Sequence, residues 1–218
     1  MEEICRAYDW IIRKGWAFYW GTSEWKAADI AEAHMICDKY NLVKPIVEQC
    51  QYNLLQRDNM EQEYRNLFEK KLLGTTVWSP LASGVLTGKY NEGIPEGSRF
   101  DTNPDLLRIF NQYFSEEKKE KTIEALKKLK AIADRFGCSM AQLAMAWVIS
   151  NPDVSTAITG CSRPEQLQDT IKALDVVDKL TPEVQREIED AFGTAPNNRF
   201  NSRDFQTYKS RRLEKLNY

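Results

Sequence analysis

The sequence predicts an α/β fold of about four parallel strands with helices, arranged as the second half of an eight-stranded (β/α)8 TIM barrel. Helical and strand patterns alternate along the 218 residues, and strict alternation predicts parallel strands joined by crossover helices. Polar and glycine-rich segments follow the strands, at the carboxyl ends where barrels and open α/β sheets carry their sites. Four strands do not close a barrel, and the chain holds no second copy of them.

The first third of the chain predicts two helices and two strands. Residues 2–14 place apolar side chains on one helical face. Residues 16–22 are aromatic and apolar at successive positions, which is typical of a strand covered on both faces. Ser23 is placed to cap the next helix, and residues 44–52 form the second strand.

The middle of the chain predicts a helix, a strand and a long loop. Apolar side chains between residues 60 and 68 mark the helix, and residues 73–78 form the third strand. From Ser79 to about Phe114 the chain is rich in Gly, Pro, Asn and Asp, which predicts irregular structure. A loop of this length in a compact domain is usually functional.

The fourth strand lies between two groups of helices. Two helices meet at Gly137, and the second opens with a capping box formed by Ser139 and Gln142. Residues 154–159 then form the strand.

Two more helices end the predicted fold. The first opens with a capping box of Ser162 and Glu165, and the second starts at Thr181. We therefore expect the half barrel to occupy residues 1–196, and residues 197–218 to form a polar, frayed tail.

Composition narrows the classes of function. The chain is 42% hydrophobic and 28% charged with a net charge of -2, which is typical of a soluble globular protein and excludes a strongly basic nucleic-acid surface. Five cysteines without Cys-x-x-Cys spacing indicate reduced thiols in the cytosol. His34 is the only histidine, so one chain cannot build a histidine metal cluster or a Ser-His-Asp triad.

The strongest candidate for ligand binding runs from Thr76 to Tyr90. The chain leaves the third strand at Trp78, whose ring offers a flat surface for a planar heterocycle. A proline, small residues and two glycines follow, which let the backbone approach a ligand, and Lys89 can meet an anionic group. The alternative is an ordinary surface loop.

Two further places could contact a ligand. Residues 160–163 join the fourth strand to a helix, where free N–H groups and Arg163 would bind a phosphate, although Ser162 can equally act as a cap and Arg163 as a solvated side chain. Ser23 and Gln49 end the first two strands and could hold a carboxamide or satisfy the strand-end backbone.

The residues predict no catalytic constellation. Tyr19, Tyr52 and Tyr90 are candidate general acids, but no lysine and aspartate accompany them at a telling spacing.

Several stretches of the sequence together resemble those of the aldo-keto reductase superfamily. Within it they are most similar to the voltage-gated potassium channel β subunits, in particular the plant members. The resemblance covers residues 2 to about 195 in order. The stretches that carry it are Tyr19–Ser23, Val47–Gln49 with Tyr52, Trp78–Ala82, Gly88–Tyr90, Ile94-Pro95 with Ser98-Arg99, and Thr159-Gly160 with Ser162 and Pro164–Leu167.

The resemblance implies a (β/α)8 barrel that binds NADPH in extended form across the carboxyl ends of its strands. Ser23 and Gln49 would hold the nicotinamide carboxamide and Trp78 would stack on the ring. The residues that would bind the phosphates and the adenosine end of the cofactor are Ser79, Pro80, Leu81, Ala82, Ser83, Lys89, Arg99, Gly160, Ser162, Arg163, Gln166, Asp169 and Thr170. Arg163 would meet the 2′-phosphate, which favours NADPH over NADH.

The sequence departs from the family pattern at three positions in or next to these stretches. Glu24 stands where the animal channel subunits have arginine, and Asp169 and Thr170 stand where they have glutamate and asparagine. The family's catalytic aspartate, tyrosine and lysine belong to the first four strands, so no catalytic residue is carried over.

Three functions follow from the resemblance. The first is a cytoplasmic, NADPH-binding regulatory subunit, in the family a homotetramer, that reaches the membrane only through a potassium channel α subunit. The second is an NADPH-dependent aldehyde or ketone reductase, and the third is a truncated product without activity. The exposed edges and inner face of a half barrel also predict pairing with another chain or poor solubility.

Overall fold

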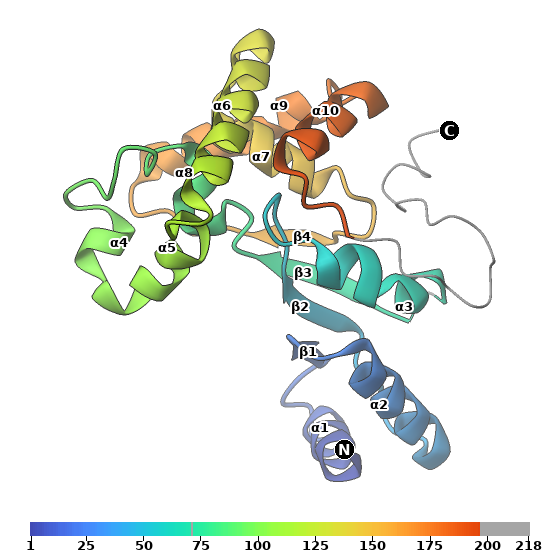
Figure 1. The fold of residues 1–218 in the computed structure, drawn as a ribbon. Coiled ribbons are helices and arrows are strands. Elements are labelled where there is room, and N and C mark those ends of the chain that lie inside the picture. The colour runs from blue at the N-terminus through green and yellow to red at the C-terminus, as the bar shows by residue number, and fades with distance from the viewer. Residues whose placement is uncertain (71, 197–218) are drawn as a thin grey trace.

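The chain folds around one four-stranded parallel sheet (Figure 1). The computed structural model describes residues 1–70 and 72–196, and the tail predicted at 197–218 lies outside the described residues. The strands follow the chain in the order β1 (Gly21–Ser23), β2 (Val47–Gln51), β3 (Gly74–Trp78) and β4 (Thr156–Ile158). Each pairs in parallel with its neighbour, which confirms the predicted α/β fold with four parallel strands.

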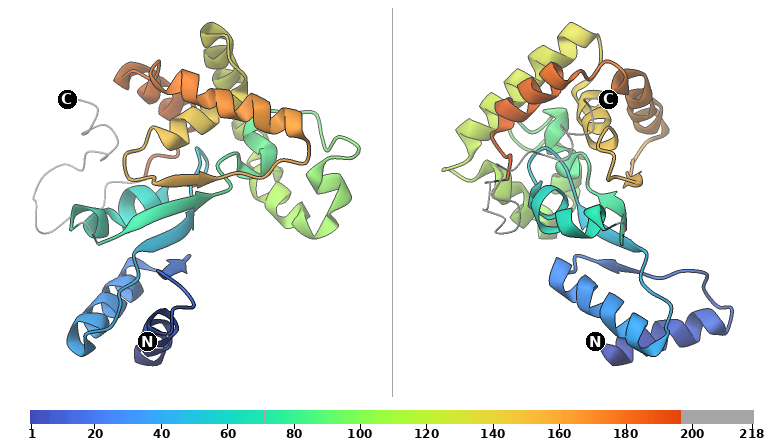
Figure 2. Two further views of the ribbon diagram at one scale, coloured as in Figure 1. Left: turned by 180° about the vertical axis from the view of Figure 1, so that it is seen from behind. Right: turned by 90° about the vertical axis from the view of Figure 1, so that its right-hand side faces the viewer.

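Helices lie beyond both edge strands of this sheet, β1 and β4. Figures 1 and 2 show α1 and α2 beside β1, while α6, α7, α9 and α10 gather beyond β4. The α-helices are α1 (Glu2–Arg13), α2 (Ala27–Tyr40), α3 (Arg65–Glu69), α4 (Arg99–Thr102), α5 (Leu107–Phe114), α6 (Lys119–Phe136), α7 (Met140–Ile149), α8 (Pro164–Thr170), α9 (Leu174–Val177) and α10 (Pro182–Phe192). A π-helical turn, η1 (Asn59–Glu63), precedes α3, and the 3-10 helices are η2 (Ala82–Thr87), η3 (Pro104–Leu106) and η4 (Ile171–Ala173).

The two faces of the sheet differ in burial. Successive residues of a strand point to opposite faces. On one face Thr22, Glu48 and Thr75 are buried. On the other face Gln49 is exposed and Ile158 keeps 42% of its surface accessible. A barrel has a helix-covered outer face and an inner face that the full ring of strands closes, so this sheet has the character of part of a barrel.

The main hydrophobic core lies on the buried face of the sheet. Trp147 on α7 is fully buried at its centre, and its ring centroid lies 5.2 Å from that of Tyr52. Leu126 and Leu129 of α6 and Ile188 of α10 pack in the same cluster. Burying side chains of this size contributes about 1.5–3 kcal/mol each, so the helices beyond β4 anchor the sheet.

A smaller core joins α1 to α2 beneath β1. It contains Cys5, Trp20, Ala33 and Cys37. Burial raises the pKa of Cys37 to about 12, and its hydrogen bond with Cys5 acts in the same direction. A thiol with such a pKa stays protonated at neutral pH, so Cys37 serves the packing.

The predicted strand over residues 16–22 is wrong in extent and burial. Only Gly21–Ser23 pairs with a neighbour, because β2 begins opposite Gly21 at Val47. Upstream of that point Phe18 is 88% and Tyr19 is 70% exposed. The apolar pattern predicted that both faces of this strand would be covered; instead β1 is an edge strand of the described sheet, and the residues before it lie outside the pairing.

The helix caps confirm some predictions and contradict others. Ser139 and Gln142 form the expected capping box, and Thr181 caps α10. Ser23 does not cap α2, because it lies within β1 and Lys26 occupies the N-cap position.

The long segment after Ser79 is less irregular than the sequence predicted, since it contains η2, α4, η3 and the eight-residue α5.

The contact between β1 and β2 leaves no room for a side chain at Gly21. A Cβ atom there would lie 2.5 Å from the carbonyl oxygen of Val47. We expect Gly21→Ala to lower the free energy of unfolding by about 1–3 kcal/mol, because backbone atoms must move apart. The matched control is Gly74→Ala at the start of β3, where the nearest atoms lie 3.4 and 3.5 Å away. Urea titrations in which both variants lose the same stability would contradict this prediction.

Candidate functional site

Three of the predicted residues lie on one face of the sheet, Ser23 and Trp78 at the carboxyl ends of β1 and β3 and Gln49 in the middle of β2. Ser23 pairs with Gln49 across β1 and β2, and Trp78 ends β3 opposite Gln51. The Ser23 hydroxyl donates to the carbonyl oxygen of Gln49 at 3.1 Å, and both side chains lie on the exposed face of the sheet. A planar ring, an amide and a hydroxyl therefore share one face of the sheet, and each is at least partly exposed.

Glu24 joins these strand ends together. Its carboxylate accepts a hydrogen bond from the indole N–H of Trp78 at 2.8 Å and from the backbone N–H of Gln51 at 2.6 Å. The side-chain amide of Asn59 adds a third donor at 3.4 Å. Sequence reasoning singled out Glu24 only as a departure from a family pattern and missed that it orients the tryptophan. Its place directly after Ser23 was the available signal.

The segment after β3 makes a tight turn through an unusual backbone conformation. Ser79, Ala82 and Ser83 have positive φ values of 55°, 48° and 56°, and Gly84 follows at 94°. Such values are rare for residues other than glycine. The Ser79 hydroxyl accepts the N–H of Ser83 at 3.1 Å, and the Asn53 amide donates to the Ser79 carbonyl at 2.9 Å. These bonds hold the turn against the end of the sheet.

The members of this turn differ in accessibility. Pro80 and Ala82 are buried, whereas Ser79, Leu81 and Ser83 are partly exposed. The last three can therefore present atoms to a ligand directly, while the first two shape the turn. Their contacts with a cofactor stay a prediction.

Lys89 folds back over this turn. A Cβ atom on Gly84 would lie 2.9 Å from Cε of Lys89, and the Lys89 ammonium lies 4.9 Å from the ring centroid of Tyr90. Gly84 is therefore needed both for its positive φ and for the passage of the lysine. Arg99 begins α4 as an exposed side chain.

The loop after β4 presents a second group of predicted residues. Gly160 has open space where a side chain would be. The hydroxyl and N–H of Ser162 both donate to Oε1 of Gln166, at 3.1 and 3.0 Å. The predicted capping box of Ser162 with Glu165 is therefore wrong, because Arg163 is the N-cap residue and α8 begins at Pro164. Arg163 itself is exposed at this helix start.

Asp169 and Thr170 already serve the packing of α8. The carboxylate of Asp169 accepts from the Ser139 hydroxyl at 2.9 Å and from the Gln142 amide at 2.6 Å. Thr170 is buried, and its hydroxyl donates to the carbonyl of Gln166 at 2.8 Å. Their predicted contacts with a cofactor would have to coexist with these bonds.

The candidate general acids lie in different surroundings. The Tyr52 hydroxyl is fully buried, donates to Glu61 at 2.7 Å and accepts from Asn151 at 3.0 Å. Tyr90 is buried in an aromatic cluster with Phe100. Burial therefore gives these two tyrosines a structural role.

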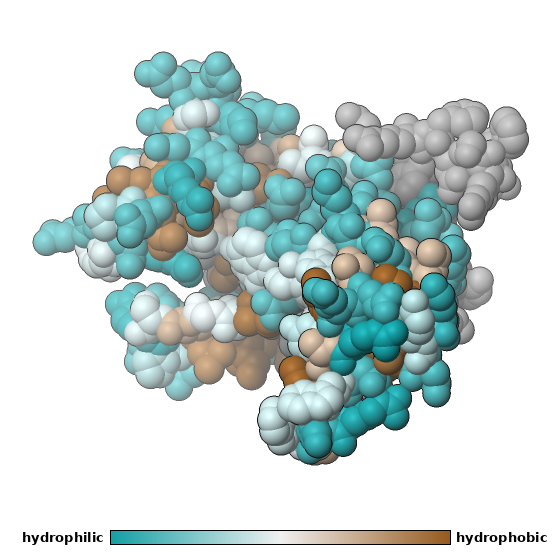
Figure 3. Space-filling view, turned by 90° about the horizontal axis from the view of Figure 1, so that it is seen from below, coloured by the Kyte–Doolittle hydropathy of each residue, from teal (hydrophilic) through white to brown (hydrophobic). Residues whose placement is uncertain are grey.

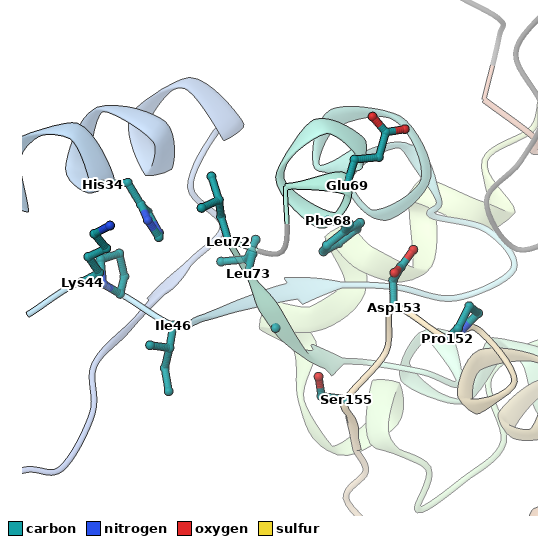
Figure 4. Close-up of a pocket in the computed structure, with 12 residues that line it drawn as sticks. His34, Lys44, Ile46, Phe68, Glu69, Leu72, Leu73, Pro152, Asp153 and Ser155 are labelled. Atoms are coloured by element: carbon teal, nitrogen blue, oxygen red, sulfur yellow. The ribbon is translucent and has the colours of Figure 1, made fainter. Parts of the chain in front are cut away.

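A cavity of about 770 Å³ opens at the opposite, amino-terminal edge of the sheet. In Figure 4, His34 and Lys44 lie at one end and Asp153 and Ser155 at the other, with Leu72 and Leu73 between them. None of the predicted cofactor residues lines this cavity. It lies away from the carboxyl ends of the strands and plays no part in the candidate site.

His34 should make the stability of the chain depend on pH. Burial lowers its pKa, Lys44 acts in the same direction and Asp38 opposes them. The unfolded chain therefore binds the proton more readily, so the contribution of His34 is present above its unfolded pKa of about 6.5 and is lost as pH falls through the folded value. His34→Gln should remove this part of the pH dependence between pH 7.5 and 5.5.

The measurement is a set of urea titrations at several pH values, read as the difference between variant and parent. The subtraction is needed because burial raises the pKa of Glu48, which shifts stability in the opposite direction. The chain has no other histidine. A difference that stays constant over this pH range would contradict the prediction.

Hydrophobic residues reach the surface on several parts of the chain. Figure 3, seen from the side of α1 and α2, shows hydrophobic residues between wide hydrophilic areas. No helix among residues 1–70 and 72–196 combines the length and hydrophobicity needed to cross a bilayer.

Comparison with known proteins identifies one matching family and several similar proteins. Residues 1–192 match the aldo/keto reductase family. A provisionally named voltage-gated potassium channel subunit beta of Schizosaccharomyces pombe is 46% identical over 196 residues, covering 90% of this chain and 56% of that protein. Proteins of Arabidopsis thaliana and Oryza sativa subsp. japonica, each named "Probable voltage-gated potassium channel subunit beta", are 47% identical over 197 residues, covering 90% of this chain and 58% of each relative. The chain thus spans little more than half the length of these relatives.

Proposed function

The chain belongs to the aldo/keto reductase family, and from this premise we propose that it forms the NADPH-binding part of a protein like the potassium channel β subunits. The observation that carries the proposal is that Ser23, Gln49 and Trp78 share one face of β1, β2 and β3 beside the tight turn after β3. When bound, NADPH supplies a hydride for reduction of a carbonyl group.

The geometry fits the nicotinamide end of such a cofactor. The exposed amide of Gln49 and hydroxyl of Ser23 lie opposite each other on adjacent strands, where they can supply donors and acceptors for a carboxamide. The Trp78 indole is held by Glu24 rather than free to rotate. A stacking surface that is fixed in advance loses less entropy on binding.

The phosphates would be held by the loops on either side. The turn at Ser79–Gly84 brings small residues and backbone close to the strand ends, with Lys89 folded over it. The open space at Gly160 and the exposed guanidinium of Arg163 suit the adenosine end. Arg99, on the long loop, supplies a further positive charge.

The first test is a titration of the purified chain with NADPH, followed by tryptophan fluorescence, with NADH as the control. We expect saturable quenching with NADPH and much weaker binding of NADH, because the 2′-phosphate adds charge-assisted hydrogen bonds. No response to either nucleotide would overturn the proposal that this part of the chain binds the cofactor.

The channel partner is a separate part of the proposal and rests on the names of the relatives. We propose that the protein acts in the cytoplasm as a homotetramer and meets the membrane through a channel α subunit. Co-purification with the cytoplasmic domain of a plant or fungal potassium channel, compared with an unrelated cytoplasmic domain, would test it. Turnover of a simple aldehyde with NADPH and no retention by the channel domain would favour a carbonyl reductase instead.

A further inference from the structure

The carboxylate of Glu24 is oriented by neutral donors only. Its three partners are the indole of Trp78, the backbone N–H of Gln51 and the amide of Asn59. No lysine or arginine among the described residues forms an ion pair with it. The hydrogen bonds therefore fix the position of the carboxylate while a full negative charge stays at the strand ends.

The backbone holds Glu24 in this place as well. Its φ value is 56°, a conformation that residues other than glycine rarely adopt. The N–H of Glu24 donates to the carbonyl of Gln49 at 3.2 Å. A non-glycine residue in this conformation marks a position that the surrounding contacts determine. Here those contacts aim the side chain at the Trp78 indole.

We propose that Glu24 both positions Trp78 and biases the site toward the oxidised cofactor, NADP⁺. This inference rests on the proposed function, because it assigns the nicotinamide ring to Trp78. The oxidised nicotinamide ring carries one positive charge, and the reduced ring is neutral. A fixed carboxylate beside the stacking surface therefore attracts the oxidised form and leaves the reduced form unaffected. Glu24 is a positioning residue and also a determinant of which oxidation state stays bound.

The test compares two dissociation constants, for NADP⁺ and for NADPH, in the parent chain and in Glu24→Gln. Glutamine keeps an oxygen that can accept the indole N–H of Trp78 but removes the charge. We expect the affinity for NADP⁺ relative to NADPH to fall about threefold to tenfold, the range of one opposite-charge interaction at an exposed site screened by water. Raising the salt concentration should shrink this difference.

Two controls separate charge from structure. Glu117→Gln changes the net charge equally at an exposed position between α5 and α6, and should leave the ratio of affinities unchanged. Glu24→Ala also removes the hydrogen bond to Trp78, and should weaken both nucleotides in addition to changing the ratio.

The outcomes distinguish this inference from the proposed function. Binding of both nucleotides with the same ratio in Glu24→Gln as in the parent would overturn the inference and leave the proposed function standing. Failure of the parent to bind either nucleotide would overturn the proposed function, and the inference with it.

Discussion

Replacing Arg57 by alanine is expected to lower the free energy of unfolding by about 3–5 kcal/mol. The guanidinium is buried and donates to both oxygens of Glu61, at 2.8 and 2.6 Å, and to Glu189 on α10 at 3.0 Å. Removing it leaves two carboxylates in the core without their cation. Burial alone would lower the pKa of Arg57, but the two carboxylates outweigh it and raise the pKa, so the charged form is the one that stabilises the fold.

A surface pair offers a matched control for this prediction. Arg135 on α6 binds Glu187 on α10, and both side chains are about half exposed. Arg135→Ala should lower stability far less than Arg57→Ala does, because water screens the pair and solvates the remaining carboxylate. Urea unfolding of both variants gives the comparison. Equal losses would contradict the role assigned to the buried group.

The buried ion group illustrates what sequence reasoning could not reach. Arg57 and Glu61 are four residues apart, a spacing that suggests a local helical pair. Glu189 lies 132 positions further along the chain than Arg57, and no periodicity connects the two. Such a contact depends on how α10 packs against the segment after β2, which only the tertiary structure determines.

The order and direction of the strands were predictable, because alternation of helices and strands leaves few topologies. The length of a strand was not, since it depends on its neighbours: the aromatic run before Gly21 has strand character but pairs only from Gly21 onward. The hydrogen bond from Ser162 to Gln166 replaced an equally plausible cap with Glu165. Local sequence preferences do not decide which side chain pairs with a serine when two polar residues nearby can both form the hydrogen bond.

The candidate site could be predicted in composition but not in geometry. Proline, glycines and small residues after Trp78 indicated a close turn, and that turn is present. Positive φ values at Ser79, Ala82 and Ser83 could not be predicted, because residues with side chains avoid this region. The anchoring of Trp78 by Glu24 was equally hidden, since it requires the ends of β1 and β3 to be known in space.

Arg163 should decide the preference between the two nucleotides. It is exposed at the start of α8 after β4, and its guanidinium makes no ion pair among the described residues. Charge-assisted hydrogen bonds to a phosphate contribute about 1.5–3 kcal/mol. We therefore expect Arg163→Gln to weaken NADPH binding about 10-fold to 100-fold and to leave the binding of NADH unchanged.

The selectivity, rather than the affinity alone, tests the assignment. Arg186→Gln on α10 removes the same charge from an exposed position, and titrations with both nucleotides should show little change. If Arg163→Gln weakens NADPH and NADH equally, its guanidinium acts on the part that the two nucleotides share, and the 2′-phosphate must be held elsewhere. Lys89 and Arg99 would then be the next substitutions, because they are the remaining cations assigned to the phosphates.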